Sequence, residues 1–112
     1  MARGEGPPAQ AKVTKQVIVR RLAEQHLAEA SAWYEQQATG LGSNFLDRFE
    51  EALAQIARFP ESGPIVFLDY RRLLLRRFPY GVFYVLEGNL IVVAAIYHLA
   101  RHPRIIQENL RP

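Results

Sequence analysis

The sequence feature that most constrains the fold is a continuous apolar run near the C-terminus, residues 90–97. All eight residues are apolar, and four of them are Ile or Val. A strand with one face in water alternates polar and apolar side chains, whereas a strand buried on both faces reads as a continuous apolar run. We therefore expect this run to form the central strand of a sheet.

Two turn signals divide residues 70–104 into a meander of three strands and a basic exit segment. Gly88 and Asn89 form a two-residue hairpin loop, because both tolerate the left-handed backbone that tightly paired antiparallel strands require. Residues 78–81, Phe-Pro-Tyr-Gly, are the predicted turn between the first two of these strands. The three strands should therefore pair in sequence order.

Two helices are expected before the meander, over residues 22–37 and from about residue 41 to residue 58. Apolar residues recur there at steps of three and four, the spacing of one helix face. Gly40 suits a left-handed helix cap, and Pro60 stops the second helix because the residue before a proline avoids the helical region. The short connection predicts an antiparallel helical hairpin. The expected core stripes are Ala23, Leu27, Ala30, Trp33 and Tyr34 on the first helix and Leu46, Phe49, Leu53 and Ile56 on the second.

These elements predict one α+β domain over residues 17–112, in the order β-α-α-β-β-β. Residues 17–21 begin with three β-branched residues and are the expected first strand. The antiparallel sheet is packed on one face by the N-terminal helical hairpin, and its other face is expected to be partly open. Residues 61–69 are expected to be a loop, and residues 1–16, rich in Gly, Pro and Ala, a disordered or extended tail.

Arginine is the only cation of the predicted domain, because both lysines, Lys12 and Lys15, lie in the tail. Residues 59–112 carry seven arginines against four acidic residues, within a chain of net charge +3. The planar guanidinium suits phosphates and carboxylates. Charge on a strand edge also protects it from aggregation, so a binding role and a solvated edge are both open.

Several classes of site are excluded by composition. The absence of cysteine rules out disulfides, thiolate metal sites and a cysteine nucleophile. No apolar run approaches the length of a membrane span, so we expect a cytoplasmic protein without a membrane partner. His98 and His102 have a ligand spacing, but Pro103 and a strand end argue against a helix there. We expect His98 to be a hydrogen-bonded structural residue, and we expect neither a metal nor a cofactor.

The chain resembles the ParE/RelE superfamily of bacterial toxins from type II toxin–antitoxin systems, most of all its ParE branch, over residues 17–104. The order and spacing of several short motifs carry the resemblance. They are Trp33-Tyr34-Glu35 with Gln37, Gly40-Leu41-Gly42, Phe45, Phe59-Pro60, Arg71-Arg72, Phe78-Pro79-Tyr80 with Tyr84, and His98 with Arg101 and Pro103.

The resemblance implies a growth-inhibiting toxin of the kind linked to plasmid stabilisation. It would form a hetero-oligomer with a cognate antitoxin, which we expect to be a ParD-like ribbon-helix-helix protein. ParE-like members are gyrase poisons, whereas RelE-like members cleave mRNA in the ribosome. RelE-like nucleases combine basic residues, often lysines, with arginines on late strands and a tyrosine near the C-terminus. Here the domain has no lysine, and residues 105–110 have no tyrosine.

We therefore expect a non-enzymatic inhibitor that binds DNA gyrase, without catalytic residues. The residues expected to contact the partner are Arg72, Arg76, Arg77, Tyr80 and Arg101. Two alternatives are open. One is a RelE-like, ribosome-dependent mRNA endoribonuclease that uses Arg76, His98 and Arg101 around the phosphate and the proton transfers. The other is a degenerate member that only binds its antitoxin and DNA.

Overall fold

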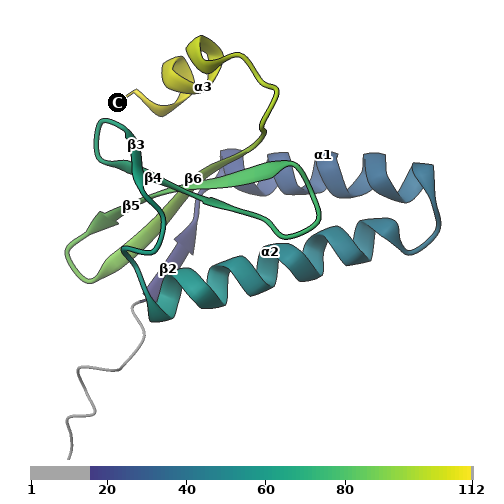
Figure 1. Cartoon of the computed structure of the whole chain (residues 1–112), viewed down its shortest axis with the longest axis horizontal. Coiled ribbons are helices and arrows are strands. Elements are labelled where there is room, and N and C mark those ends of the chain that lie inside the picture. The colour runs from purple at the N-terminus through teal and green to yellow at the C-terminus, as the bar shows by residue number, and fades with distance from the viewer. Residues whose placement is uncertain (1–15, 112) are drawn as a thin grey trace, which may run out of the picture.

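The structure, a computed structural model, describes residues 16–111. The predicted tail lies outside these residues except for Gln16, which begins the first strand. The elements in chain order are β2 (Gln16–Val19), α1 (Arg21–Gln37), α2 (Leu41–Arg58), β3 (Ile65–Phe67), β4 (Tyr70–Leu74), β5 (Tyr80–Glu87), β6 (Leu90–His98) and α3 (Pro103–Leu110). The predicted α+β class and the order of helical hairpin and meander are confirmed (Figure 1).

The strands form one five-stranded sheet in the order β2-β6-β5-β4-β3. The apolar run became β6, an interior strand with neighbours on both sides, while β5 occupies the middle. The sheet is antiparallel from β6 to β3, but β2 joins β6 in parallel, with Gln16 opposite Leu90 and Val19 opposite Val93. A parallel pair needs a long crossover connection, and the two helices supply it. The expectation of a wholly antiparallel sheet is therefore corrected at the β2 edge.

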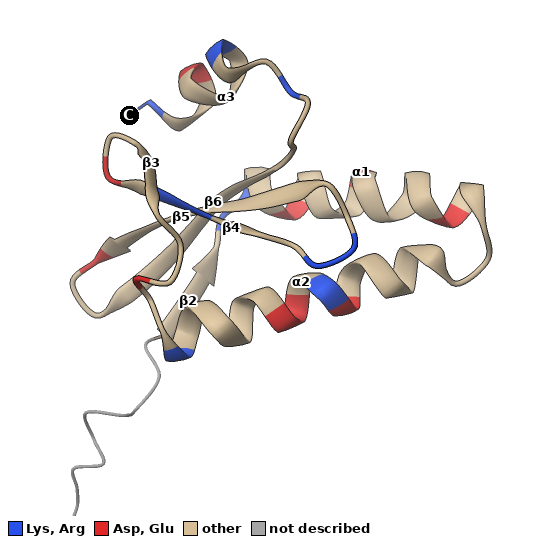
Figure 2. Ribbon diagram, viewed as in Figure 1, with Lys and Arg blue, Asp and Glu red and all other residues tan. Residues whose placement is uncertain are grey.

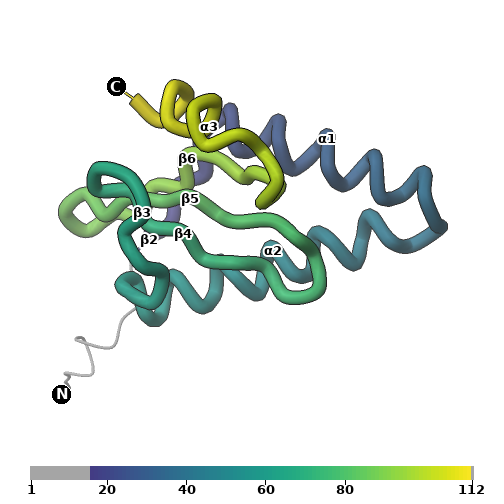
Figure 3. The backbone as a smooth tube through the Cα atoms, turned by 45° about the horizontal axis from the view of Figure 1, so that its top comes forward, coloured from purple at the N-terminus to yellow at the C-terminus, as the bar shows by residue number. Residues whose placement is uncertain are grey.

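The helical hairpin covers one face of the sheet (Figures 1 and 3). Its buried side chains pack on one set of strand residues to form the main core, and each large one contributes about 1.5–3 kcal/mol. Gly40, with a φ of 88°, lets the chain reverse between the helices. A Cβ on Gly42 would stand 2.6 Å from the Ser31 carbonyl oxygen, so only glycine permits this close crossing.

Two residues assigned to the core from helical spacing lie outside it. Trp33 is 55% exposed and Leu46 is 39% exposed. Each is next in sequence to a residue that does belong to the main core or packs against it, Tyr34 beside Trp33 and Phe45 beside Leu46, so each lies at the margin of the buried face of its helix. Helical periodicity identifies the buried face but not where its margin falls. Tyr34, by contrast, packs against the main core as expected.

The opposite face of the sheet carries a smaller cluster, partly covered by α3 (Figure 3). Leu110 of α3 packs there with Phe83 and Tyr97. Neither α3 nor the three-residue strand β3 was predicted, because such short elements give little periodic signal. The α3 helix starts where the His102 Nδ1 accepts the Arg104 N–H at 3.0 Å, with Pro103 in its first turn. His102 is therefore a helix cap.

The segment expected to be a loop, residues 61–69, contains β3 and is fixed by Tyr84. This buried phenol donates to the Pro60 carbonyl at 2.7 Å and accepts the Gly63 N–H at 3.0 Å. Arg71 donates to the Gly63 carbonyl at 2.8 Å, so backbone carbonyls and not a carboxylate satisfy this inward arginine.

Within residues 16–111, none of the helices has the length and hydropathy of a membrane span.

Candidate functional site

The turn between β4 and β5 is set by its aromatic residues. It occupies residues 75–79 and so begins earlier than predicted, since β5 already starts at Tyr80. The Leu75 N–H donates to the Tyr80 carbonyl at 2.9 Å, which closes the turn. Arg77 inside it has a φ of 72°, a left-handed conformation that costs a residue with a side chain about 1–2 kcal/mol. Packing of the residues on either side of Arg77 keeps its backbone in this conformation.

Four aromatic rings attach this turn to the helical hairpin. Centroid separations run from 4.9 Å, between Tyr34 and Phe78, to 6.1 Å, between Tyr34 and Tyr80, with Phe45 in contact with all three. Such pairs contribute about 0.5–1.5 kcal/mol each beyond their buried area. The aromatic cluster therefore fixes both the turn and the first residue of β5 relative to α1 and α2.

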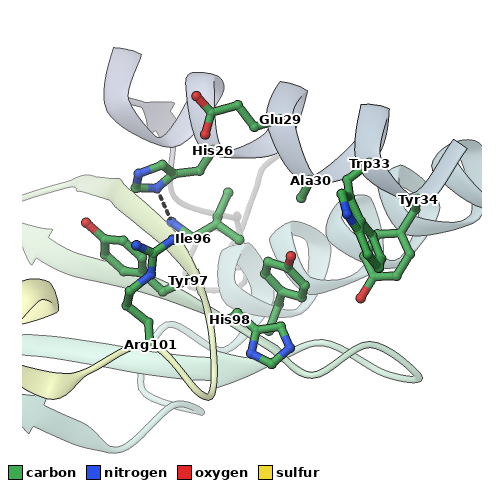
Figure 4. A pocket seen from close by; sticks show the side chains of 10 residues that line it. His26, Glu29, Ala30, Trp33, Tyr34, Ile96, Tyr97, His98 and Arg101 are labelled. Atoms are coloured by element: carbon green, nitrogen blue, oxygen red, sulfur yellow. Dashed lines mark hydrogen bonds between the residues drawn. The ribbon is translucent and has the colours of Figure 1, made fainter. Parts of the chain in front are cut away.

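Beside this cluster lies a cavity of about 390 Å³, between α1 and the ends of β5 and β6 (Figure 4). The α1 helix presents one row of side chains to it, and the strands and the segment after β6 present another. The polar and aromatic groups that reach it include His26, Glu29, Trp33, Tyr80, His98 and Arg101. The cavity thus combines planar rings with one guanidinium and one carboxylate.

His26 connects α1 to the end of β6, beyond the residues of β6 that pair with β2. Its Nδ1 accepts the Ile96 N–H at 3.1 Å, and its ring lies 4.6 Å from that of Tyr97 (Figure 4). Burial lowers the pKa of His26, Glu29 opposes that shift, and Arg101 adds to it. The imidazole is therefore held neutral, as an acceptor must be.

The other side of the cavity holds two phenols, an imidazole and a guanidinium. Burial raises the pKa of both Tyr34 and Tyr80, so both phenols keep their protons. His98 lies 5.2 Å from the Tyr80 ring, and its Nδ1 accepts the Ala100 N–H at 2.9 Å, which is the predicted structural hydrogen bond. The Arg101 guanidinium sits over Tyr97 at 5.9 Å and stays accessible.

The structure brings Tyr80, His98 and Arg101 together but leaves Arg76 apart. Arg76 lines another cavity, of about 280 Å³, and lies 3.6 Å from Glu51. Glu51 also pairs with Arg48 on the preceding turn of α2. In Figure 2 the basic turn lies beside α2, away from the segment that follows β6. The three residues of the nuclease alternative therefore do not line a common cavity.

The remaining predicted contact residues differ in accessibility. Arg77 is exposed and lines a third cavity with Phe78 and Pro79. Arg72 is half-buried, since its stem lies where a side chain on Gly81 would stand, 2.8 Å from a Cβ there. The Arg72 Nε is buried without a hydrogen-bond partner among the described residues. Arg72 is therefore less accessible than the other three arginines among the predicted contact residues.

Sequence reasoning missed the contribution of α1 to the cavity. His26, Glu29 and Trp33 follow one another at steps of three and four, so they share one helix face. A polar and aromatic row of that kind could have been recognised beside the apolar stripe. Among residues 16–111, no group of three or more histidine or acidic side chains is placed to hold a metal ion.

A family model matches most of the chain, and a solved structure has a similar fold. A family model described as ParE toxin of type II toxin-antitoxin system, parDE, matches residues 17–103. A similar solved structure is described as the chromosomal ParDE TA system from P. aeruginosa. It is 18% identical, has a TM-score of 0.66, and the match covers 76% of this chain and 96% of that one. At that identity the likeness shows the fold alone. No curated protein sequence matches the chain.

Proposed function

Because this chain belongs to the ParE toxin family of type II toxin–antitoxin systems, we propose that it inhibits DNA gyrase by binding and is neutralised by a cognate antitoxin. The toxin would act in the cytoplasm, where gyrase works on DNA, and would persist as a hetero-oligomer while antitoxin is present. The proposal extends to plasmid stabilisation, in which loss of the antitoxin frees the toxin.

The observation that carries the binding mechanism is the separation of the basic groups. Cleavage of RNA needs a base, an acid and a cation around one phosphate. Here Arg76 is engaged by Glu51 in one cavity, while His98 and Arg101 belong to another. The described residues also contain no lysine to complete either group. This distribution favours docking over a reaction centre.

Two exposed regions would contact gyrase or its DNA. One is the turn that carries Arg76 and Arg77, and the other is the cavity rim with Tyr80 and Arg101. Exposed charges of this kind accelerate encounter with a complementary surface more than they deepen affinity. Arg72 would contribute less, since its half-buried position limits direct contact.

The antitoxin is expected to cover apolar surface that the toxin leaves in water. Ile65 and Leu68, at and beside edge strand β3, are each 56% exposed, and Leu74 on β4 is 51% exposed. The β3 strand has a neighbour on one side only, so an incoming segment could add a strand there. An acidic, amphipathic antitoxin segment would satisfy both the apolar patch and the basic charge of the chain.

A supercoiling assay with purified gyrase tests the proposal. The toxin should block supercoiling and accumulate cleaved DNA, and a double variant, Arg76→Ala with Arg77→Ala, should weaken this by about tenfold or more. Arg58→Ala removes an exposed arginine at the end of α2 and serves as the matched control. Undiminished supercoiling at excess toxin would refute gyrase as the target.

A RelE-like ribonuclease is the second candidate, because His98 and Arg101 share a cavity with the Tyr80 phenol. Primer extension on translated mRNA would detect its cuts at the ribosomal A site. Cuts that disappear in His98→Ala, together with unaffected supercoiling, would replace the gyrase proposal with this one. Unhindered growth on expression without antitoxin would instead indicate the degenerate member.

A further inference from the structure

We propose that the cavity between α1 and the end of β6 binds one unpaired base of single-stranded DNA, with the adjoining phosphate at Arg101. The proposal rests on the proposed function for its biological setting, since gyrase supplies opened DNA. The binding itself depends only on the residues that line the cavity.

The walls of the cavity are planar and accessible. Trp33 is 55% exposed at the rim, and its ring is held edge-on to Tyr34 at 5.0 Å. Tyr80 and His98, which also line the cavity, form a second ring pair with centroids 5.2 Å apart. A base can stack on such rings whatever its identity, because every base has a flat π-face. An exposed tryptophan held in place by a neighbouring ring is suited to that role.

The charge around the cavity sets the orientation of the nucleotide. Arg101, His102 and Arg104 are all exposed, and no acidic residue occurs between His98 and Gln107. This basic segment leads away from the cavity and can follow a phosphate backbone. Glu29 is the one carboxylate among the lining residues, and it stands on the opposite wall on α1 (Figure 4). It repels phosphate, which leaves the Arg101 side for the backbone and the Trp33 side for the base.

The dimensions and the neutral donors agree with this ligand. A volume of about 390 Å³ lies at the low end of the range for small-ligand sites, about 300–1,000 Å³, and suits a single nucleotide. The phenols of Tyr34 and Tyr80 both line the cavity and can donate hydrogen bonds to base carbonyls. A paired base inside a duplex cannot enter such a cavity, so single strands should be preferred. A peptide is less suited, because the ring walls and the basic segment match stacking and phosphate more closely than an apolar side chain.

Trp33 provides a direct assay because it is the only tryptophan of the chain. Titration of the full chain with decathymidylate should quench its fluorescence. The ten-base-pair duplex and an abasic decamer with the same phosphates should bind at least tenfold more weakly. Absence of quenching, or equal binding of the abasic strand, would overturn the proposal. Tenfold tighter binding of decauridylate would assign the cavity to RNA and overturn it as well, as would quenching by an acidic peptide alone.

Variants separate stacking from charge. Arg101→Ala should weaken decathymidylate binding about tenfold and reduce the slope of log K against log salt by about 0.7, the value for one phosphate of a single strand. Arg58→Ala removes the same charge at the distant end of α2. It should leave the affinity for decathymidylate within about twofold of wild type and the salt slope within about 0.2. Trp33→Ala, followed with a labelled oligonucleotide, should lose at least tenfold in affinity. It should keep its melting temperature, because the side chain is mostly in water. Equal effects of Arg101→Ala and Arg58→Ala would overturn the assignment of the phosphate to Arg101.

The same samples in the supercoiling assay distinguish failure of this proposal from failure of the proposed function. Oligonucleotide binding without inhibition of gyrase would leave the cavity assignment standing and remove the gyrase mechanism. Inhibition of gyrase without oligonucleotide binding would remove the cavity assignment and leave the gyrase mechanism standing.

Discussion

Tyr84→Phe should destabilise the fold far more than the loss of one oxygen atom suggests. The Tyr84 side chain is completely buried, and its hydroxyl joins the Pro60 carbonyl to the Gly63 N–H. Each hydrogen bond contributes about 1 kcal/mol net, and a buried donor left without a partner costs about 1–3 kcal/mol. The Gly63 residue is itself buried, so water cannot readily replace the phenol. We expect a loss of about 2–3 kcal/mol in the free energy of unfolding.

Urea denaturation followed by circular dichroism measures this loss, and a constant m-value would show that the unfolded state is unchanged. The melting temperature should fall by roughly 10–20 °C for a domain of this size. Tyr97→Phe is the matched control: its hydroxyl accepts the Asn109 side-chain amide at 2.6 Å, and Asn109 is exposed and can turn to water. We expect a loss of about 0.5–1 kcal/mol there. Losses within 0.5 kcal/mol of each other would refute the reasoning.

Three further predictions concern the backbone and His26. Gly42→Ala should cost about 1–3 kcal/mol, because its Cβ would stand 2.6 Å from the Ser31 carbonyl oxygen; an unchanged urea midpoint would contradict this. Arg77→Gly should raise the free energy of unfolding by about 0.5–1 kcal/mol, since glycine accepts the left-handed backbone, yet should weaken gyrase inhibition by removing a contact cation. The pKa of His26 is lower in the folded protein than in the unfolded chain, where it is about 6.5. Neutral His26 therefore stabilises the fold fully above that unfolded pKa, and this stabilisation is lost as the pH falls through the folded pKa. Stability measured from pH 7.5 to 5 should fall less steeply in His26→Gln, whose side-chain oxygen can still accept the Ile96 N–H.

The fold was predictable where patterns were long. The spacing of apolar residues gave both helices within about one residue, and Pro60 follows the end of α2 as expected. Gly40 was expected to cap the end of α1, but it caps the start of α2, and the C-cap of α1 is Ala38. The strands β5 and β6 followed from the apolar runs around the Gly88-Asn89 loop. The parallel pairing of β2 could not be read from its own four residues, because register and direction depend on where the crossover delivers the chain. The short elements β3 and α3 are likewise fixed by packing against distant residues.

The candidate site was predictable only in its C-terminal half. Tyr80, His98 and Arg101 come from one meander, so their proximity follows from pairing, with Tyr80 directly opposite His98. The hydrogen bond between His26 and Ile96 joins residues seventy positions apart in the sequence, so no local pattern predicts it. Trp33 was assigned to the core because helical aromatic residues usually lie there. Instead it lines the cavity beside the end of β6, where it stays exposed, and the position of that cavity is a property of the whole fold.

Some of the residues that carry the family resemblance are packed inside the fold and are physically distinct from the exposed residues that would choose the target. Phe45 and Phe78 are packed together, so any chain that joins a hairpin to this turn in the same way needs rings at those places. Their presence indicates the fold and gives no information about the target. Arg77 and Arg101 are exposed residues, so their replacement should change what the toxin binds without unfolding it. Exchange of these exposed arginines between related toxins should therefore move inhibition from one target to another, whereas exchange of a packed ring should lower stability alone.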